Sequence, residues 1–236
     1  ELILEFVQPT GWSSVDTAEE IRQKLEFAGI NLSNESSHCV ATGYGRISVP
    51  YADKTVTEIT CHALGAVHLF QHPDLTVIDI GGQDTKIIQI EQGFVKDFIM
   101  NDKCAAGTGR FLEVMANTLS LRPNEMFDLA RLGSDTTISS MCTVFAESEV
   151  IGLIGKGEPK ENIAYAVVNS TIRKVAAQVS RMNGEMFTFC LTGGLCECDY
   201  IREALSKELG KDVFSCPDAR YAGAIGAALS AMKIRK

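Results

Sequence analysis

The stretch "TVIDIGGQDTKIIQIEQGFVKDFIM", residues 76–100, constrains the fold more than any other part of the chain. It contains three runs rich in β-branched and aromatic residues, separated by the pairs Gly81-Gly82 and Gln92-Gly93. Short β-prone runs joined by glycine turns are typical of strands that pair with their neighbours in the chain. We therefore predict a three-stranded meander, around which the rest of this part of the chain must pack.

Regular elements are also predicted on both sides of the meander. Apolar residues at helical or alternating spacing predict helices over 108–119, 144–154, 161–182 and 201–209, strands over 187–191 and 212–216, and a last helix from residue 222. Upstream, the same rules predict strands over 2–7 and 38–45 and helices over 15–28 and 56–70, with Ser14 as N-cap and Gly29 as the stop of the first helix. The order indicates an α/β protein of two lobes, 1–73 and 74–217, with the C-terminal helix 218–236 completing the first lobe.

Bulk composition excludes several classes of function. The chain has 236 residues, of which 45% are hydrophobic and 22% charged, which is a globular composition. A net charge of −8 argues against binding to nucleic acid or to an acidic membrane. Neither a signal peptide nor an apolar run of about 20 residues is present, so we expect a cytoplasmic protein. Its eight cysteines then favour reduced thiols and metal chemistry over disulfides.

Three glycine-rich turns stand where predicted strands end or a helix begins. "DIGGQD" and "LTGGL" each place two glycines after an apolar strand, and "YAGAIGAA" opens the last helix. Glycines let backbone N–H groups approach a phosphate, and Asp79 would suit Mg²⁺, which prefers oxygen ligands. Taken singly, the turns are explained equally well by a hairpin, a strand-to-helix turn and a helix–helix contact. Together they indicate a nucleotide in a cleft between two lobes, although neither a Walker A loop nor a full GxGxxG pattern is present.

Two cysteines stand directly before predicted helices. Cys104 lies in "NDKCAAGTGR" and Cys142 in "SSMCTVFAESEV", and the N–H groups and dipole of a first helical turn stabilise a thiolate. Core packing is the alternative for a lone cysteine. We expect core packing for Cys39, Cys61 and Cys190. We interpret Cys196, Cys198 and Cys216 as incidental loop thiols. The four histidines, His38, His62, His68 and His72, we expect to be structural or exposed.

These motifs, in this order and spacing, resemble the activators of 2-hydroxyacyl-CoA dehydratases, a family that includes the ATP-binding subunits of benzoyl-CoA reductase (BadF/BadG/BcrA/BcrD type). The resemblance runs from about residue 39 to residue 232 and rests on "VIDIGGQDTKII", the two cysteine motifs, "LTGG" and "YAGAIGAA". The family belongs to the acetate and sugar kinase, Hsp70 and actin superfamily. The resemblance thus implies a two-lobed actin-like ATPase (ribonuclease H-like) fold with a nucleotide cleft between the lobes.

The resemblance also implies roles for individual residues. Asp79 would lie near Mg²⁺ as a catalytic residue, with Gln83 beside it. The remaining nucleotide neighbours would be Gly81, Gly82 and Gln83 in the second phosphate loop, Gly193 and Gly194 in the adenosine loop, Ala222 and Gly223 at the last helix, and Glu147 by analogy with a nucleotide-facing helix.

Cys104 and Cys142 match the family's iron-ligating cysteines, which hold one [4Fe-4S] cluster between the two subunits of a homodimer. Two thiolates from each of two symmetric chains supply the four that a cubane cluster needs. The implied function is an ATP-dependent one-electron donor, reduced by a ferredoxin or flavodoxin, that activates a partner iron–sulfur dehydratase or reductase acting on an acyl-CoA. Two alternatives stay open: a metal-free small-molecule kinase of the superfamily, and a regulator that binds a nucleotide or an iron–sulfur cluster without hydrolysis.

One family feature has no counterpart in this sequence. Members begin with a first phosphate loop of the type DxGSTxxK, whereas this chain opens with "ELILEFVQPTGWS". Either the natural protein has residues before Glu1, or the terminal phosphate is not positioned in the usual way. We favour the first explanation because the rest of the cleft is intact, and ATP hydrolysis by the chain as printed is left open.

Overall fold

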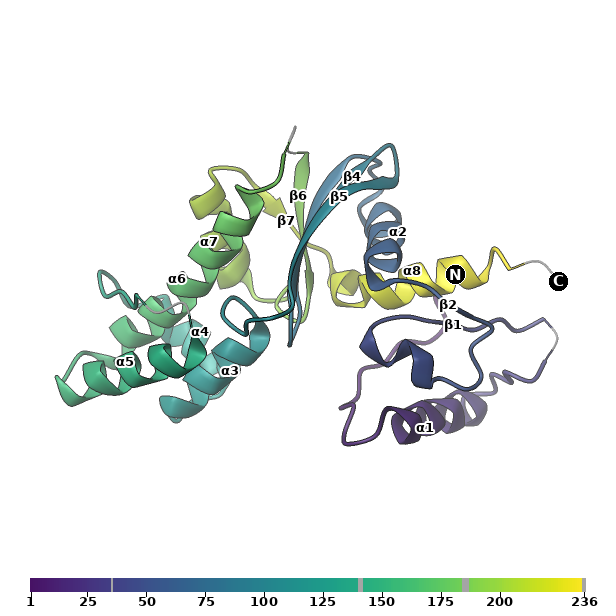
Figure 1. Cartoon of the computed structure of the whole chain (residues 1–236), viewed down its shortest axis with the longest axis horizontal. Coiled ribbons are helices and arrows are strands. Elements are labelled where there is room, and N and C mark those ends of the chain that lie inside the picture. Colours follow the sequence, from purple (N-terminus) through teal and green to yellow (C-terminus); the bar gives the residue numbers. More distant parts are fainter. Residues whose placement is uncertain (35, 140–141, 184–186, 235–236) are drawn as a thin grey trace.

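A five-stranded sheet forms the centre of the molecule (Figure 1). The structure is a computed structural model and describes residues 1–34, 36–139, 142–183 and 187–234. The strands lie in the order β5-β4-β3-β6-β7, with β3, β4 and β5 antiparallel and β6 and β7 parallel to β3. Their bounds are β3 (Leu75–Ile80), β4 (Thr85–Glu91), β5 (Phe94–Asn101), β6 (Thr188–Gly193) and β7 (Val213–Phe214). The predicted meander is therefore confirmed.

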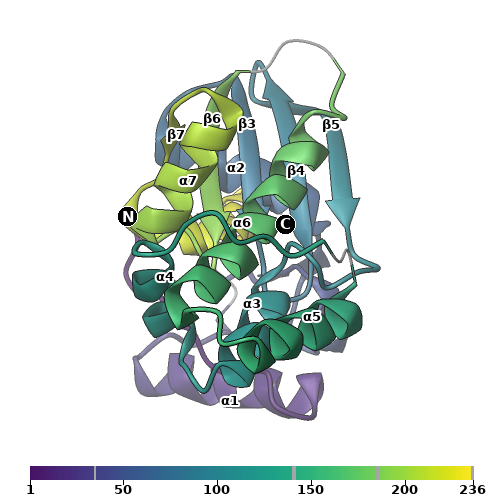
Figure 2. The same ribbon diagram turned by 90° about the vertical axis from the view of Figure 1, so that its left-hand side faces the viewer.

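Helices cover the two faces of this sheet. One face packs on α3, α6 and α7 through Ile78, Ile87 and their neighbours, and α4 and α5 lie outside these (Figure 2). The opposite face packs on α2 through Val77 and Ile88. The helices are α1 (Ser14–Phe27), α2 (Glu58–Phe70), α3 (Gly109–Thr118), α4 (Pro123–Ala130), α5 (Thr143–Gly155), α6 (Lys160–Val179), α7 (Asp199–Leu209) and α8 (Ala222–Ala231).

The last helix, α8, returns to pack on α2 in very close contact. A Cβ on Gly65 would lie 1.9 Å from the carbonyl oxygen of Ala222, and one on Gly226 would lie 1.7 Å from that of Cys61. Only glycine at these two positions allows the backbones to come so near. The small residues of "YAGAIGAA" thus serve the helix–helix contact, the alternative considered for this motif.

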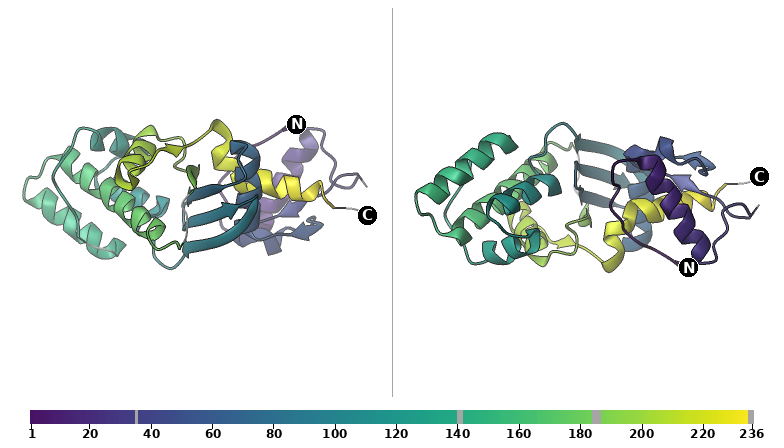
Figure 3. Two further views of the ribbon diagram at one scale, coloured as in Figure 1. Left: turned by 90° about the horizontal axis from the view of Figure 1, so that it is seen from above. Right: turned by 90° about the horizontal axis from the view of Figure 1, so that it is seen from below.

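The N-terminal part lies alongside α8, at one end of the long axis (Figure 3). It contains α1, the short parallel strands β1 (Val40–Ala41) and β2 (Lys54–Thr55), and the 3₁₀ helix η1 (Tyr44–Ser48); a second such helix, η2 (Pro217–Tyr221), precedes α8. The boundary between lobes at residues 73 and 74 stays a prediction, as does the C-terminal helix 218–236, of which residues 235 and 236 lie outside the described part. Within the described ranges, no helix has the length and apolar character needed to cross a membrane.

Several predictions about local structure need correction. No strand forms over residues 2–7, where Ile3 and Val7 are exposed, because the segment pairs with no strand of the described chain. The strand predicted over 38–45 has only two residues, since Gly43 turns the chain into η1 with φ +80°. Helix α4 was not predicted, and Ser13, not Ser14, caps α1.

Candidate functional site

Two glycine turns that are far apart in the sequence lie side by side at one edge of the sheet. β3 and β6 are parallel neighbours, and their last residues, Ile80 and Gly193, are register partners. The turn after β3 carries Gly81, Gly82 and Gln83, of which the last two are exposed. The structure thus brings together the phosphate and adenosine turns inferred from sequence, because parallel strands end at the same edge.

Gly193 is fixed at its position by both conformation and space. Its φ is +81°, and a Cβ there would lie 2.6 Å from the carbonyl oxygen of Ile80 and 2.7 Å from Asp79 Oδ1. Any side chain would therefore push against the strand end and against the carboxylate below it. Gly194 has no such neighbour and is exposed at the cleft.

An open cleft of about 1060 Å³ runs along this edge. Three arginines and Glu113, which pairs with Arg110, line the cleft together with glycines from both turns and from the start of α3. These residues are Gly82, Gln83, Gly109 and Gly194, with Arg110, Arg122 and Arg220. Glycine backbone and guanidinium groups are what a polyphosphate requires.

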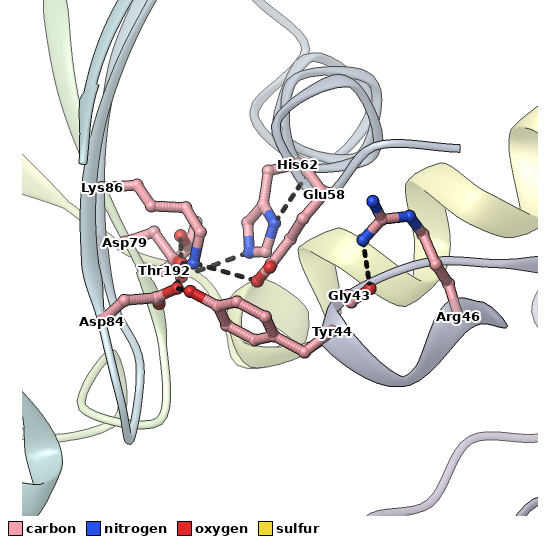
Figure 4. Close-up of polar contacts among 9 residues, drawn as sticks. All are labelled: Gly43, Tyr44, Arg46, Glu58, His62, Asp79, Asp84, Lys86 and Thr192. Carbon is pink, nitrogen blue, oxygen red and sulfur yellow. Dashed lines mark hydrogen bonds and ion pairs between the residues drawn. The ribbon is translucent and has the colours of Figure 1, made fainter. Parts of the chain in front are cut away.

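Asp79 is buried beneath the turns in a row of polar side chains that crosses three strands. Thr192, Asp79 and Lys86 are register partners on β6, β3 and β4 and point to the face that α2 covers (Figure 4). Thr192 Oγ1 donates to Asp79 Oδ1 over 3.0 Å, and His62 Nε2 of α2 lies 3.2 Å from the same oxygen. The carboxylate is 2% exposed, so these partners fix its orientation.

Lys86 is the centre of the charged contacts in this row. Its Nζ lies 2.5 Å from Asp84 Oδ1, 2.9 Å from Glu58 Oε1 and 3.3 Å from Asp79 Oδ2. Asp84 also accepts a hydrogen bond of 2.9 Å from the hydroxyl of Tyr44 in η1. The cluster therefore connects the 3₁₀ helix, α2 and the sheet (Figure 4).

The pKa values follow from these contacts. Burial alone would raise the pKa of Asp79, but His62 and Lys86 outweigh it and hold the pKa well below the usual range. Burial would lower the pKa of His62, whereas the Asp79 carboxylate raises it more strongly. The pKa of Lys86 is raised above its ordinary value because its carboxylate partners outweigh burial. Asp79 is thus ionised and Lys86 is charged at neutral pH.

This cluster also contains a candidate cation site. One ligand atom each of Glu58, His62 and Asp79 lie within 4.8 Å of one another. The carboxylate oxygens suit a hard cation such as Mg²⁺, which takes few protein ligands and completes its shell with phosphate and water. The donor set therefore fits Mg²⁺ bound with a nucleotide, although the ammonium of Lys86 contacts the same carboxylates.

The loop with Cys104 is attached to the phosphate turn by hydrogen bonds. Gly109 N donates to the carbonyl of Gly81 over 2.9 Å, and Arg110 N donates to that of Gly82 over 2.8 Å. The side-chain amide of Asn101 donates to the carbonyl oxygens of Cys104 and Ala106, each over 2.9 Å. The start of α3, the cysteine loop and the phosphate turn are thus joined.

Of the two thiols predicted to hold a metal, Cys142 is the exposed cysteine of the described chain, and Cys104 has the same intermediate exposure as Cys39, Cys198 and Cys216. Cys142 is the N-cap of α5 and is exposed, Cys104 is partly exposed, and their helices α5 and α3 pack together. Residues 140 and 141 of the Cys142 motif lie outside the described ranges. Cys196, interpreted from sequence as a loop thiol, is instead buried in the core, which raises its pKa to about 11.

Five of the predicted nucleotide neighbours do not line the cleft of about 1060 Å³, namely Gly81 and Gly193 at the two turns, and Ala222, Gly223 and Glu147. Ala222 and Gly223 are buried at the α2 contact, where a Cβ on Gly223 would lie 2.8 Å from Cε1 of His62. Glu147 lies on α5 and accepts a hydrogen bond from Thr118 of α3 over 3.2 Å. Their roles at a nucleotide stay predictions.

Sequence reasoning missed the partners of Asp79. His62 was treated as structural or exposed, and Glu58 and Lys86 were not considered. Two signals were present: Glu58 and His62 are four residues apart on one helix face, and Lys86 directly precedes the apolar pair Ile87-Ile88 in a predicted strand.

The fold, together with its structural neighbours, defines an actin-like ATPase. The chain belongs to the BadF/BadG/BcrA/BcrD ATPase family, whose match spans residues 8–231. It is 42% identical to the (R)-2-hydroxyglutaryl-CoA dehydratase activating ATPase of Acidaminococcus fermentans, over 99% of this chain and 89% of the relative.

Solved structures agree with this assignment. The crystal structure of (R)-2-hydroxyglutaryl-CoA dehydratase component A of Acidaminococcus fermentans matches with a TM-score of 0.86 and 42% identity, over 95% of this chain and 86% of that one. The activator of 2-hydroxyisocaproyl-CoA dehydratase from Clostridium difficile with bound ADPNP matches with a TM-score of 0.80 and 34% identity, over 93% and 84%. The predicted fold class and family are thereby confirmed.

Proposed function

We propose that this protein is an ATP-dependent activator that passes one electron to a partner iron–sulfur enzyme acting on an acyl-CoA. The observation that carries the proposal is the pair of hydrogen bonds from the start of α3 to the carbonyls of Gly81 and Gly82. A nucleotide that moves the phosphate turn would therefore also move the start of α3, which follows the Cys104 loop in the chain. Relatives named as activators of acyl-CoA dehydratases support the same function.

The nucleotide part of the proposal concerns the cleft. Gly81, Gly82, Gly193 and Gly194 would surround the phosphates and nucleoside, and arginines would offset phosphate charge. Asp79 would offer an oxygen ligand to Mg²⁺, and Gln83, exposed at the tip of its turn, would help to position the water that attacks the terminal phosphate. The relative with bound ADPNP supports ATP as the ligand.

The metal part concerns the two accessible thiols. Cys104 and Cys142 would be the protein ligands, two from each of two subunits, and the bound [4Fe-4S] cluster would supply a single low-potential electron. Apolar side chains of α5, the helix that Cys142 caps, support a homodimer because they are strongly exposed: Val144 by 67%, Phe145 by 68% and Ile151 by 56%. Asn101 would hold the Cys104 loop in place.

In the proposed reaction, a reduced ferredoxin or flavodoxin loses one electron and the partner dehydratase or reductase gains it. Water breaks the terminal phosphoanhydride bond of ATP in the same cycle, which gives ADP and phosphate. The cytoplasmic setting expected from the sequence belongs to this proposal, because oxygen-sensitive clusters need a reducing compartment.

The test is anaerobic purification of the full-length protein with analysis of iron and sulfide, EPR after reduction, and an ATPase assay. We expect about four irons per dimer, loss of iron in Cys104→Ser, and wild-type iron in the control Cys198→Ser. Absence of iron, or equal loss in both variants, would overturn the proposal. A colourless protein that phosphorylates a small molecule would indicate a kinase instead.

A further inference from the structure

Lys86 is an unusual residue to find inside a protein, because its whole side chain is buried and only 1% exposed. Its ammonium has three donors, and three carboxylates, those of Asp84, Glu58 and Asp79, lie within 3.3 Å of it (Figure 4). A buried lysine is rare unless it is paired. Here the pairing is complete, so the lysine is a fixed positive charge in a fixed place.

That place coincides with the candidate cation site. Glu58 and Asp79, which with His62 offer ligand atoms within 4.8 Å of one another, are both partners of Lys86. A divalent ion bound there would take an oxygen from each of the two carboxylates that the ammonium already contacts. The lysine and the ion therefore compete for the same carboxylates.

We propose that Lys86 is a built-in counter-cation that keeps divalent cations out of the acidic cluster until a nucleotide carries one in. This inference rests on the proposed function for its physiological meaning, because it makes Mg²⁺ binding conditional on ATP. Lys86 is a positioning residue, which acts through Asp79 and Glu58.

The charges of the cluster explain why a divalent cation would be excluded without a nucleotide and admitted with one. Three carboxylates and one ammonium leave two net negative charges with His62 neutral, and they leave less when His62 is protonated. An incoming divalent ion would lie within a few ångströms of the ammonium in a poorly screened interior, where like charges repel strongly. The phosphates of a bound nucleotide add negative charge beside the cluster and offset this repulsion.

The lysine also has a reason to be buried here. Without a counter-cation, three carboxylates this close would repel one another in the metal-free protein. Lys86 therefore holds Asp79 and Glu58 ready for the ion while the cleft is empty. The role requires an ammonium that is tethered within the fold, and β4 supplies it because Lys86 is the register partner of Asp79.

The test uses Mn²⁺ alone as the probe, with nucleotide-free protein, and reads binding by EPR of unbound Mn²⁺ and by calorimetry. We expect Lys86→Met to bind Mn²⁺ at least about tenfold more tightly than wild type. The control Lys96→Met removes an exposed lysine that pairs with Glu91 on the neighbouring strand, and it should bind like wild type.

A second variant keeps the test decisive if Lys86→Met does not fold. Lys86→Met/Asp84→Asn removes the ammonium and one carboxylate outside the candidate ligand set, which leaves the same net charge as in wild type. It should also bind Mn²⁺ more tightly. Equal binding by wild type and the folded variants would overturn the proposal. Since no nucleotide, iron or partner enzyme is present, this result is independent of the outcome for the proposed function.

Discussion

At the scale of single residues, the site depends on closely packed atoms, so that few substitutions can be accommodated. Gly193 ends β6 directly above Asp79, and its conformation and surroundings both require the absence of a side chain. Asp79 in turn is fixed by Thr192, His62 and Lys86. An alteration at one residue of this set is therefore transmitted to the carboxylate.

Gly193→Ala should lower the free energy of unfolding by about 2 kcal/mol, because of its positive φ and the clash with Ile80. It should also weaken nucleotide binding by displacing Asp79. Urea denaturation and calorimetry measure the two effects. Gly194→Ala meets no atom within 4 Å and should keep wild-type stability, so equal destabilisation by both variants would contradict this account.

Cys190 provides a test of burial through pH. Burial, with a smaller effect of Cys216, raises the pKa of the Cys190 thiol to about 12. The unfolded thiol titrates near pH 8.5, so above that pH the folded state keeps a proton that the unfolded state releases, and stability falls as pH rises. The loss is at most about 1.4 kcal/mol per pH unit.

The measurement is urea denaturation between pH 8 and pH 10 for wild type and Cys190→Ala. Both proteins lose stability from other titrations, but the wild-type curve should fall more steeply. Parallel curves would show that the thiol ionises alike in both states.

At the scale of elements, sequence patterns correctly predicted the strands and turns that form between neighbouring segments of the chain. The meander follows from the turns at Gly81-Gly82 and Gln92-Gly93, and β3, β4 and β5 form as expected. Strand pairing between distant segments was not readable in this way. Residues 2–7 have a strand-like composition and no strand to pair with in the described chain.

The site shows the same division. The glycine turns and Asp79 could be found from sequence, because a strand followed by glycines is a local signal. The contacts of Asp79 with His62 and Lys86 depend on how α2 packs across β3 and β4, which only the tertiary structure determines. Ala222 and Gly223 show the reverse case, because small residues suit helix packing and ligand approach equally.

Asn101 is the element-scale connection between β5 and the cysteine loop. Asn101→Ala removes two hydrogen bonds, to the carbonyls of Cys104 and Ala106. Loss of about 1–3 kcal/mol of local stability should speed amide hydrogen exchange in residues 102–108 by about tenfold or more. Mass spectrometry of the metal-free protein measures this. Asn124→Ala, on α4, serves as the control, and unchanged exchange in Asn101→Ala would exclude the anchoring role.

At the scale of the whole molecule, positively charged side chains line the cleft of a protein whose net charge is negative. The chain carries −8, yet Arg110, Arg122 and Arg220 line the cleft. Each of these arginines pairs with a glutamate, Arg110 with Glu113, Arg122 with Glu125 and Arg220 with Glu197, so a small anion could exchange for these partners. The net negative charge of the rest of the chain discourages long polyanions such as nucleic acid.

Arg220→Ala should therefore weaken ATP binding by about tenfold, and the difference from wild type should shrink as ionic strength rises. Calorimetric titration at low and high salt measures this. Arg22→Ala, in a surface ion-pair group on α1, should bind ATP like wild type. A salt-independent loss, or the same loss in Arg22→Ala, would argue against direct phosphate contact.

The contact between α2 and α8 has a consequence for biosynthesis. Helix α8 (residues 222–231), whose backbone fits against Gly65, is translated about 150 residues after α2 (residues 58–70). Until α8 has been synthesised, the α8-facing side of α2 lacks its partner, so this part of the fold cannot form in the order of synthesis. Assembly of the α2–α8 contact must therefore wait for the segment that contains α8 to leave the ribosome.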